Sequence, residues 1–248
     1  MDRVVFVAGN AGKQLLHTQA VNSNNLANAN TTGFQAEMAK FSSRIVTGSG
    51  FRSRVFAVAE NNGFSFAKGE IQSTGRTLDV AVNGDGWLAV QAPDGSEAYT
   101  RAGNLHINVN GQLLTRSDYP VLGDAGPIIV PQNQTLEIGS DGTVSVRPLG
   151  QQPNTLSEVG RIKIVSPDKE DLEKGPDGLL RMRKGKQAPD ASTDVSLISG
   201  ALEGSNVNSV EAMVNMISLA RLFDVTVKIM STAKEMDERT TQIMNMNQ

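Results

Sequence analysis

Between Asn206 and Gln248 the apolar residues recur at the spacing of an α-helix, and the stretch contains no Pro or Gly. Asn208 and Glu211 match a capping box at its start. One apolar line, spaced by three and four positions like a coiled-coil seam, is Met213, Met216, Ala220, Phe223, Val227 and Met230. A second line beside it is Val210, Val214, Ile217, Val225 and Ile229. One partner helix covers a single line, so we expect further partners for this helix.

Residues 2 to about 30 predict a second long helix with a weaker stripe at the same spacing. Its members are Val5, Ala8, Gly12, Leu15, Gln19, Asn22 and Leu26. Gly9 and Gly12 each cost about 1 kcal/mol relative to Ala in a helix interior. We therefore expect this helix to pair with the carboxy-terminal one, the alternative being two unrelated surface helices on one domain.

The end of the first helix is rich in asparagine, a poor helix former. The residues are Asn22, Asn24, Asn25, Asn28 and Asn30, and Thr31-Thr-Gly33 follows. One interpretation is a fraying helix end. The other is that the amides bond to neighbouring backbones or to other subunits and so fix the register of packing.

Six of the eight Phe residues lie between residues 34 and about 70, among Ser, Gly, Arg and Asn. They are Phe34, Phe41, Phe51, Phe56, Phe64 and Phe66. Because a free linker needs no such side chains, we expect an extended segment that lies against other surfaces. A flexible active-site loop is the alternative.

From Leu78 the apolar period changes to two, as in Leu78-Asp-Val-Ala-Val82 and in Leu105, Ile107 and Val109. Tight-turn sequences separate these runs: Asn83-Gly-Asp-Gly86, Asp94-Gly95, Asn110-Gly111, Asp141-Gly142 and Asp177-Gly178. The pattern predicts an antiparallel all-β domain, a sandwich or barrel, with Trp87 and Tyr99 as packing residues.

Composition removes several function classes. The net charge of −3 gives no electrostatic support to nucleic-acid binding. The chain has no Cys, so thiol chemistry is excluded, and no apolar run is long enough to insert in a membrane. The amino terminus has a short apolar run after Asp2 and does not resemble a cleavable secretory signal.

No catalytic constellation stands out. The only histidines are His17 and His106, and His106 is expected at the surface. Asn83-Gly-Asp-Gly86 is like part of a calcium loop but lacks the downstream bidentate Glu. A glycosidase carboxylate pair is not excluded, but nothing distinguishes one carboxylate from another. We therefore expect no enzyme activity, no metal and no cofactor.

The layout predicts an α+β fold in which the terminal helices pair as an antiparallel coiled coil around a central all-β domain. The expected parts are a helical inner domain (1–33 and 204–248), an extended connecting region (34–75 and 191–203) and the all-β domain (76–190). Because the carboxy-terminal helix is apolar on more than one face, its surplus would be buried by other subunits. This favours a non-enzymatic, self-assembling structural subunit.

Three motifs, in order, resemble the flagellar axial protein family. The segment from Asn24 to Phe34 is similar to the amino-terminal signature of rod and hook proteins. The segment from Lys68 to Val90, with Tyr99-Thr-Arg-Ala-Gly-Asn104, is similar to the start of their β domain, and Gly200 to Ile217 is similar to their carboxy-terminal signature. Leu202-Glu-Gly-Ser205 favours a proximal rod subunit over a distal rod or hook protein, which remain the alternatives. A periplasmic cell-wall-active enzyme is a third, from another class.

The resemblance implies a torque-transmitting rod across the periplasm, exported without cleavage by the flagellar type III apparatus. The implied partners are copies of this chain and the inner proximal and distal rod subunits. The residues expected at coiled-coil or subunit contacts are Val5, Ala8, Leu15, Asn22, Asn24, Asn25, Leu26, Asn28, Met213, Met216, Ile217, Ala220, Phe223, Val227 and Met230.

Overall fold

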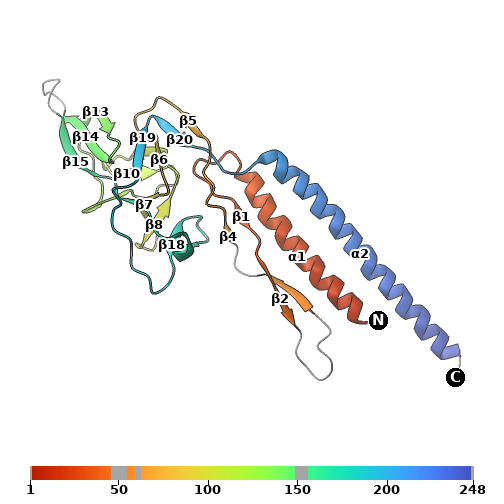
Figure 1. The fold of residues 1–248 in the computed structure, drawn as a ribbon. Helices are drawn as coiled ribbons and strands as arrows, with labels where there is room; N and C mark the ends of the chain where they lie inside the picture. Colours follow the sequence, from red (N-terminus) through yellow and green to blue (C-terminus); the bar gives the residue numbers. More distant parts are fainter. Residues whose placement is uncertain (1, 46–54, 60–62, 149–155, 247–248) are drawn as a thin grey trace. The chain divides into compact units, whose positions relative to one another are not determined.

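The structure, a computed structural model, describes residues 2–45, 55–59, 63–148 and 156–246. The chain forms two compact units built from alternating segments (Figure 1). The helical unit contains Met1–Ala29, Ala36–Ser65 and Val207–Gln248. The β unit contains Asn30–Gln35 and Phe66–Asn206. The fold is therefore α+β, as the sequence predicts.

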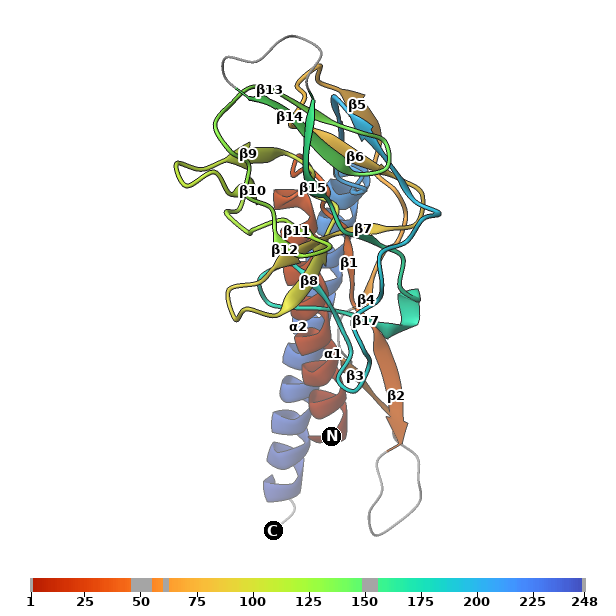
Figure 2. The ribbon, with the colours of Figure 1, turned by 90° about the vertical axis from the view of Figure 1, so that its left-hand side faces the viewer.

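Two long helices, α1 (Asp2–Ala27) and α2 (Ser209–Met246), lie side by side in the helical unit (Figures 1 and 2). They run in opposite directions, because the end of α1 lies at the start of α2: Asn22 Nδ2 donates a 2.7 Å hydrogen bond to the carbonyl of Ala212. The first turn of α1 lies near the later turns of α2, where Val4 and Ala233 line one hollow. Among the described residues, no helix is both long and apolar enough to span a membrane.

The predicted cap of α2 is confirmed. Asn208 Oδ1 accepts hydrogen bonds from the backbone amides of Val210 (3.0 Å) and Glu211 (3.2 Å). These amides have no partner inside the helix, so the cap stabilises its first turn. The sequence therefore locates the start of α2 correctly.

The predicted extended segment forms two short antiparallel pairs in the helical unit. β1 (Glu37–Met38) pairs with β4 (Gly63–Phe64), and β2 (Phe41–Ile45) pairs with β3 (Val55–Ala59). Asn10 Nδ2 of α1 donates a 2.9 Å hydrogen bond to the carbonyl of Ala57 in β3. The segment thus lies against α1. Phe51 is outside the described residues.

The β unit consists of short strands that pair antiparallel, with the 3₁₀ turn Lys169–Asp171 between two of them. The strands are β5 (Ile71–Ser73), β6 (Val80–Asn83), β7 (Trp87–Gln91), β8 (Glu97–Thr100), β9 (Leu105–Ile107), β10 (Leu113–Thr115), β11 (Leu122–Gly123), β12 (Gly126–Pro127), β13 (Asn133–Ile138), β14 (Thr143–Pro148), β15 (Ser157–Arg161), β16 (Ile164–Val165), β17 (Leu172–Lys174), β18 (Leu180–Met182), β19 (Ser196–Ser199) and β20 (Ala201–Glu203). The largest sheet has the order β16-β7-β8-β18-β17, and β13-β14-β15 form another.

The turn glycines have the backbone conformation that their sequence context predicts. Gly84, Gly95, Gly111, Gly142 and Gly178 all have positive φ angles between 80° and 118°. This region is open to glycine and strained for other residues, so each Asn-Gly or Asp-Gly pair turns the chain at low cost.

The core of the β unit is built from Val, Leu and Ile side chains of many strands. Trp87 and Tyr99, predicted as packing residues, are fully buried. The prediction that Val109 continues the strand after Ile107 is wrong, because Val109 is fully exposed in a turn. The side chain of Asn108 causes that turn: its Oδ1 accepts hydrogen bonds from the amides of Asn110 and Gln112, both at 2.9 Å.

Candidate assembly surface

The two helices pack along a seam that contains both large and small residues of α2. The least exposed residues of α2 are spaced by four and three: Ala212, Met216, Leu219, Phe223, Thr226, Met230 and Ala233. The stripe predicted on α1 lies opposite, where Ala8 and Gly12 are buried and Val5, Leu15, Gln19, Asn22 and Leu26 are half-buried. The less exposed residues of both helices thus recur at intervals of three and four positions.

Gly12 sets how closely the helices approach. A Cβ atom at Gly12 would lie 3.6 Å from Thr226 Cγ2 and 3.9 Å from Phe223 Cε2. A methyl group fits there, whereas a longer side chain would force the helices apart. The two glycines of α1 therefore differ, because a Cβ at Gly9 meets no described atom within 4 Å.

The line predicted on α2 and the buried seam overlap in three residues. Met216, Phe223 and Met230 are half-buried in the seam, whereas Met213, Ile217, Ala220 and Val227 are exposed. At its other positions the seam lies one residue before the predicted line, at Ala212, Leu219 and Thr226 in place of Met213, Ala220 and Val227. Ala212 and Thr226 are small, so their hydrophobic signal is weak. The assignment of the exposed four to subunit contacts stays a prediction.

Two apolar flanks border the seam on α2, each with a seven-residue repeat. We define the Met213 flank as Met213, Ala220 and Val227, and the Leu222 flank as Leu222, Ile229 and Met236. All six residues are exposed. Because α1 covers only the seam, both flanks of α2 remain available for further contacts.

The asparagine-rich end of α1 is tied down by its amides. Asn25 pairs with the backbone of Glu37 as a strand would, donating through Nδ2 to the carbonyl and accepting from the amide, both at 2.8 Å. Asn22 bonds to α2 as described, and Asn28 Nδ2 donates to the carbonyl of Asn24 at 2.9 Å. The side chain of Asn24 is exposed. These bonds favour the interpretation in which the amides bond to neighbouring backbones, and they argue against a fraying helix end.

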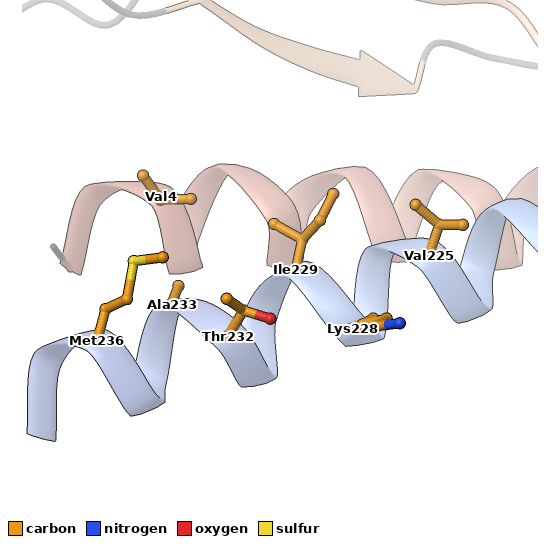
Figure 3. A pocket seen from close by; sticks show the side chains of 7 residues that line it. All are labelled: Val4, Val225, Lys228, Ile229, Thr232, Ala233 and Met236. Atoms are coloured by element: carbon orange, nitrogen blue, oxygen red, sulfur yellow. The ribbon is translucent and has the colours of Figure 1, made fainter. Parts of the chain in front are cut away.

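An apolar hollow of about 310 Å³ lies where the first turn of α1 meets α2 (Figure 3). Its lining residues are Val4, Val225, Lys228, Ile229, Thr232, Ala233 and Met236. Ile229 and Met236 belong to the Leu222 flank, so the hollow continues that flank to the end of the helix pair.

Exposed apolar side chains are concentrated on the helical unit. Of the large apolar residues that are exposed in the described chain, 18 lie in the helical unit and five in the β unit. Phe6 of α1 is 70% exposed, although burial of a Phe side chain normally stabilises a protein. Such a concentration is typical of a protein-interaction surface.

Several charged residues of the β unit form ion pairs with each other. Asp85, in the calcium-like sequence, forms ion pairs with Lys169 (2.8 Å) and Lys68 (3.0 Å), which lower the pKa of its carboxyl to about 2. Glu97 binds Lys163 at 2.8 Å. Within the described ranges, no group of three His, Cys, Asp or Glu residues is placed to hold a metal ion. His106 is partly exposed and lies 3.2 Å from Asp118.

Three family models match successive parts of the chain. Residues 7–35 match the flagella basal body rod protein, residues 81–146 match the flagellar hook protein FlgE/F/G D1 domain, and residues 198–243 match the flagellar basal body rod FlgEFG protein C-terminal. The first and last matches cover most of α1 and α2, and the middle match covers strands β7 to β13.

The chain is similar over its full length to flagellar basal-body rod proteins. It is 40% identical over 252 residues to FlgF of Salmonella typhimurium and to FlgF of Escherichia coli K12, covering 100% of each chain. It is 32% identical over 240 residues to FlgG of Buchnera aphidicola from Schizaphis graminum, covering 89% of this chain and 92% of that one. By full-length identity to the FlgF relatives and by the three family matches, the chain belongs to the FlgF family of flagellar basal-body rod proteins.

Proposed function

We propose that this chain is a structural subunit of the proximal part of the flagellar rod, and that α1 and α2 assemble with neighbouring subunits into a torque-transmitting tube. The FlgF relatives are structural rod proteins and not enzymes. The main support for assembly through the helices is the concentration of exposed apolar residues on the helical unit. Assembly removes these side chains from water, which supplies the driving force.

In this proposal the helix pair is an antiparallel coiled coil that forms the inner layer of the tube. The seam residues hold α1 to α2, and the Met213 and Leu222 flanks contact other subunits. The connecting region (34–75 and 191–203) links this inner layer to the all-β domain (76–190). The exposure of α2 supports these separate roles, because α1 covers the seam while both flanks are exposed.

The proposed partners are copies of this chain and the other rod subunits, in the part of the rod that crosses the periplasm. Export would use the flagellar type III apparatus without cleavage of the amino terminus. The family match over residues 7–35 supports a retained amino terminus, since these residues include most of α1, the partner of α2.

A distal rod subunit is the second candidate, favoured by the 32% identity to a FlgG protein. The higher identity to FlgF over the full chain argues for the proximal position. A cell-wall-active enzyme is disfavoured by the family. The ion pairs of Glu97 and Asp177 with Lys163 and Arg181 also leave those carboxylates engaged.

A charge placed on either flank of α2 tests the assembly mode. We expect Val227→Asp and Ile229→Asp, each on a different flank, to abolish swimming in a strain that depends on this chain. The matched control is Ser231→Asp, which adds the same charge to an exposed polar position of α2. Swimming is scored in soft agar, and the purified variants are checked for unchanged helix content by circular dichroism.

Normal swimming of both flank variants would exclude the flanks as assembly contacts. Loss of swimming in the Ser231→Asp control as well would mean that charge anywhere on α2 is harmful, and would equally contradict an assignment to the flanks.

A further inference from the structure

The chain passes between the helical unit and the β unit four times: after Ala29, Gln35, Ser65 and Asn206. The residues of the β unit next to these four crossing points fall in three short segments, 30–35, 66–70 and 203–206. We call these three segments the clasp. They are far apart in sequence, and all belong to the β unit.

Hydrogen bonds join the three segments of the clasp to one another. The bonds run from Gly33 N to Glu203 O (2.8 Å), Gly204 N to Glu70 O (2.8 Å), Asn206 Nδ2 to Ala67 O (2.8 Å) and Asn206 N to Phe34 O (3.2 Å). The segment 203–206 takes part in every bond. It is therefore the centre of the clasp, and the other two segments lie on it.

The side chain of Glu203 ties the clasp to the strands of the β unit. Glu203 Oε1 accepts a 2.9 Å hydrogen bond from the amide of Gly69, and Oε2 accepts a 2.7 Å hydrogen bond from Arg101 Nη1. Arg101 Nη2 donates at 2.7 Å to the carbonyl of Gly84, and its guanidinium lies 5.5 Å from the ring centroid of Trp87. Both charged side chains are only 3% exposed.

Backbone approaches in the clasp leave no room for side chains at two positions. A Cβ atom at Gly33 would collide with the backbone of Arg101 and Ala102, and one at Gly69 would collide with the carbonyl of Gly204. The segments are thus held in direct backbone contact around the buried ion pair.

Removing one partner of a buried ion pair destabilises a protein far more than removing both partners. Taking both charges out of water is costly, and their mutual attraction offsets that cost only while both are present. Removing one partner leaves the other charge buried without compensation, which favours opening of the structure around it. The segment most easily released is the clasp, since it lies at the chain's passages and not in the apolar core.

We propose that the buried Arg101–Glu203 pair is a lock that holds all four chain passages on the β unit, and that the clasp opens and closes as one unit separately from the core. Arg101 and Glu203 are positioning residues in this scheme. A mechanical role of the lock in the assembled rod rests on the proposed rod function. The lock itself is a property of the single chain, so its test is independent of assembly.

Hydrogen exchange of the full-length chain, followed by mass spectrometry, tests the lock. In Glu203→Gln and Arg101→Met we expect exchange in peptides covering 66–70 and 203–206 to accelerate by about a hundredfold or more. Exchange in β7 (Trp87–Gln91) is expected to stay within about threefold of the unmodified chain. The control, Asp171→Asn, removes an ion pair with Lys186 that lies outside both regions and should change neither.

Equal acceleration in β7 and the clasp would contradict the lock, because it would show that the pair supports the β unit as a whole. Unchanged exchange in the clasp would contradict it as well. The double variant Arg101→Met/Glu203→Leu removes both charges and is expected to be less perturbed than the two single effects combined. Effects that simply add would show that the residues act separately.

The unmodified chain provides a test that needs no variant to fold. The amides of Gly33, Gly69 and Gly204 are expected to share one opening equilibrium across a series of low denaturant concentrations, distinct from that of the β7 amides. Three different equilibria in the clasp, or one equilibrium shared with β7, would overturn the proposal.

Discussion

At the scale of single residues, glycines allow the close backbone approaches of the β unit. Gly33 has a φ of +67° and lies directly against the backbone of Arg101. Gly95 has a φ of +80°, but a Cβ there would meet no described atom within 4 Å. Both positions require a positive φ angle, but only Gly95 has room for a Cβ atom.

We predict that Gly33→Ala lowers the stability of the β unit much more than Gly95→Ala does. The Gly95 variant should cost about 1 kcal/mol, the strain of a positive φ. The Gly33 variant adds a backbone collision and should cost about 3 kcal/mol or more. Urea unfolding followed by Trp87 fluorescence measures both, and equal costs would contradict the observed approach.

Asp85 shows how neighbouring cations set the ionisation of an exposed carboxyl. Hydrogen bonds from Lys169 and Lys68 lower its pKa from 3.8 to about 2. Because the pKa of the folded state lies below that of the unfolded state, the ion pairs stabilise the fold above about pH 4. This stabilisation is lost as the pH falls through about 2. Since the carboxyl is half-exposed, the contribution is only a few tenths of a kcal/mol.

The double variant Lys68→Met/Lys169→Met is predicted to raise the pKa of Asp85 to about 3.8, the value without these partners. The carboxyl titration is followed by NMR. Asp94, whose pKa is lowered by hydrogen bonds from Ser96, is the internal control and should not change. A pKa of Asp85 that stays near 2 would mean that the lysines are not its cause.

At the scale of elements, the helix pair depends on small residues facing each other. Gly12 of α1 faces Thr226 of α2, and Ala233 lies one heptad further along the same seam. Small residues at a helix interface allow close approach and extensive dispersion contacts. The surface glycine Gly9 has no such neighbour.

We therefore predict opposite effects of one substitution at the two glycines of α1. Gly12→Leu overfills the seam and should destabilise the helix pair by about 1–3 kcal/mol. Gly9→Leu improves helix propensity and should be neutral or stabilising by up to about 1 kcal/mol. Thermal unfolding followed by helix circular dichroism compares them. A Gly12→Leu variant as stable as the Gly9→Leu variant would contradict close packing at Gly12.

Sequence periodicity predicts elements well when the pattern is carried by large side chains or by turn glycines. The two helices, the Asn208 cap, the turns at Asp94-Gly95 and Asp141-Gly142 and the buried Trp87 all follow from local chemistry. The stripe of α1 was also predictable, because Val5, Leu15 and Leu26 mark it.

Periodicity fails where the deciding interaction is small or distant in sequence. The predicted line on α2 lies one residue beyond the observed seam at three positions, for example at Val227 in place of Thr226. Small seam residues such as Thr226 and Ala233 carry little hydrophobic signal. The lock between Arg101 and Glu203 was not predicted, since the partners are separated by 102 residues. A signal was present, however: the two residues lie in separate family-like motifs, and each charge is within two residues of a glycine, Gly103 or Gly204.

At the scale of the whole molecule, the two units differ in what they expose. The β unit buries an apolar core and pairs several of its charges, whereas the helical unit leaves apolar side chains on α1, α2 and the β2–β3 pair in water. A chain with this distribution is stabilised further when the helical unit is covered. The distribution is the physical basis for placing the assembly contacts on the helices.

Electron cryomicroscopy of basal bodies purified from cells carrying this chain would show directly whether the helices form the assembly contacts. We predict density for this chain in the proximal rod, with α1 and α2 in the inner wall and both flanks of α2 against neighbouring subunits. A rod in which the β units alone form the subunit contacts, while Met213, Val227, Ile229 and Met236 face open solvent, would contradict it.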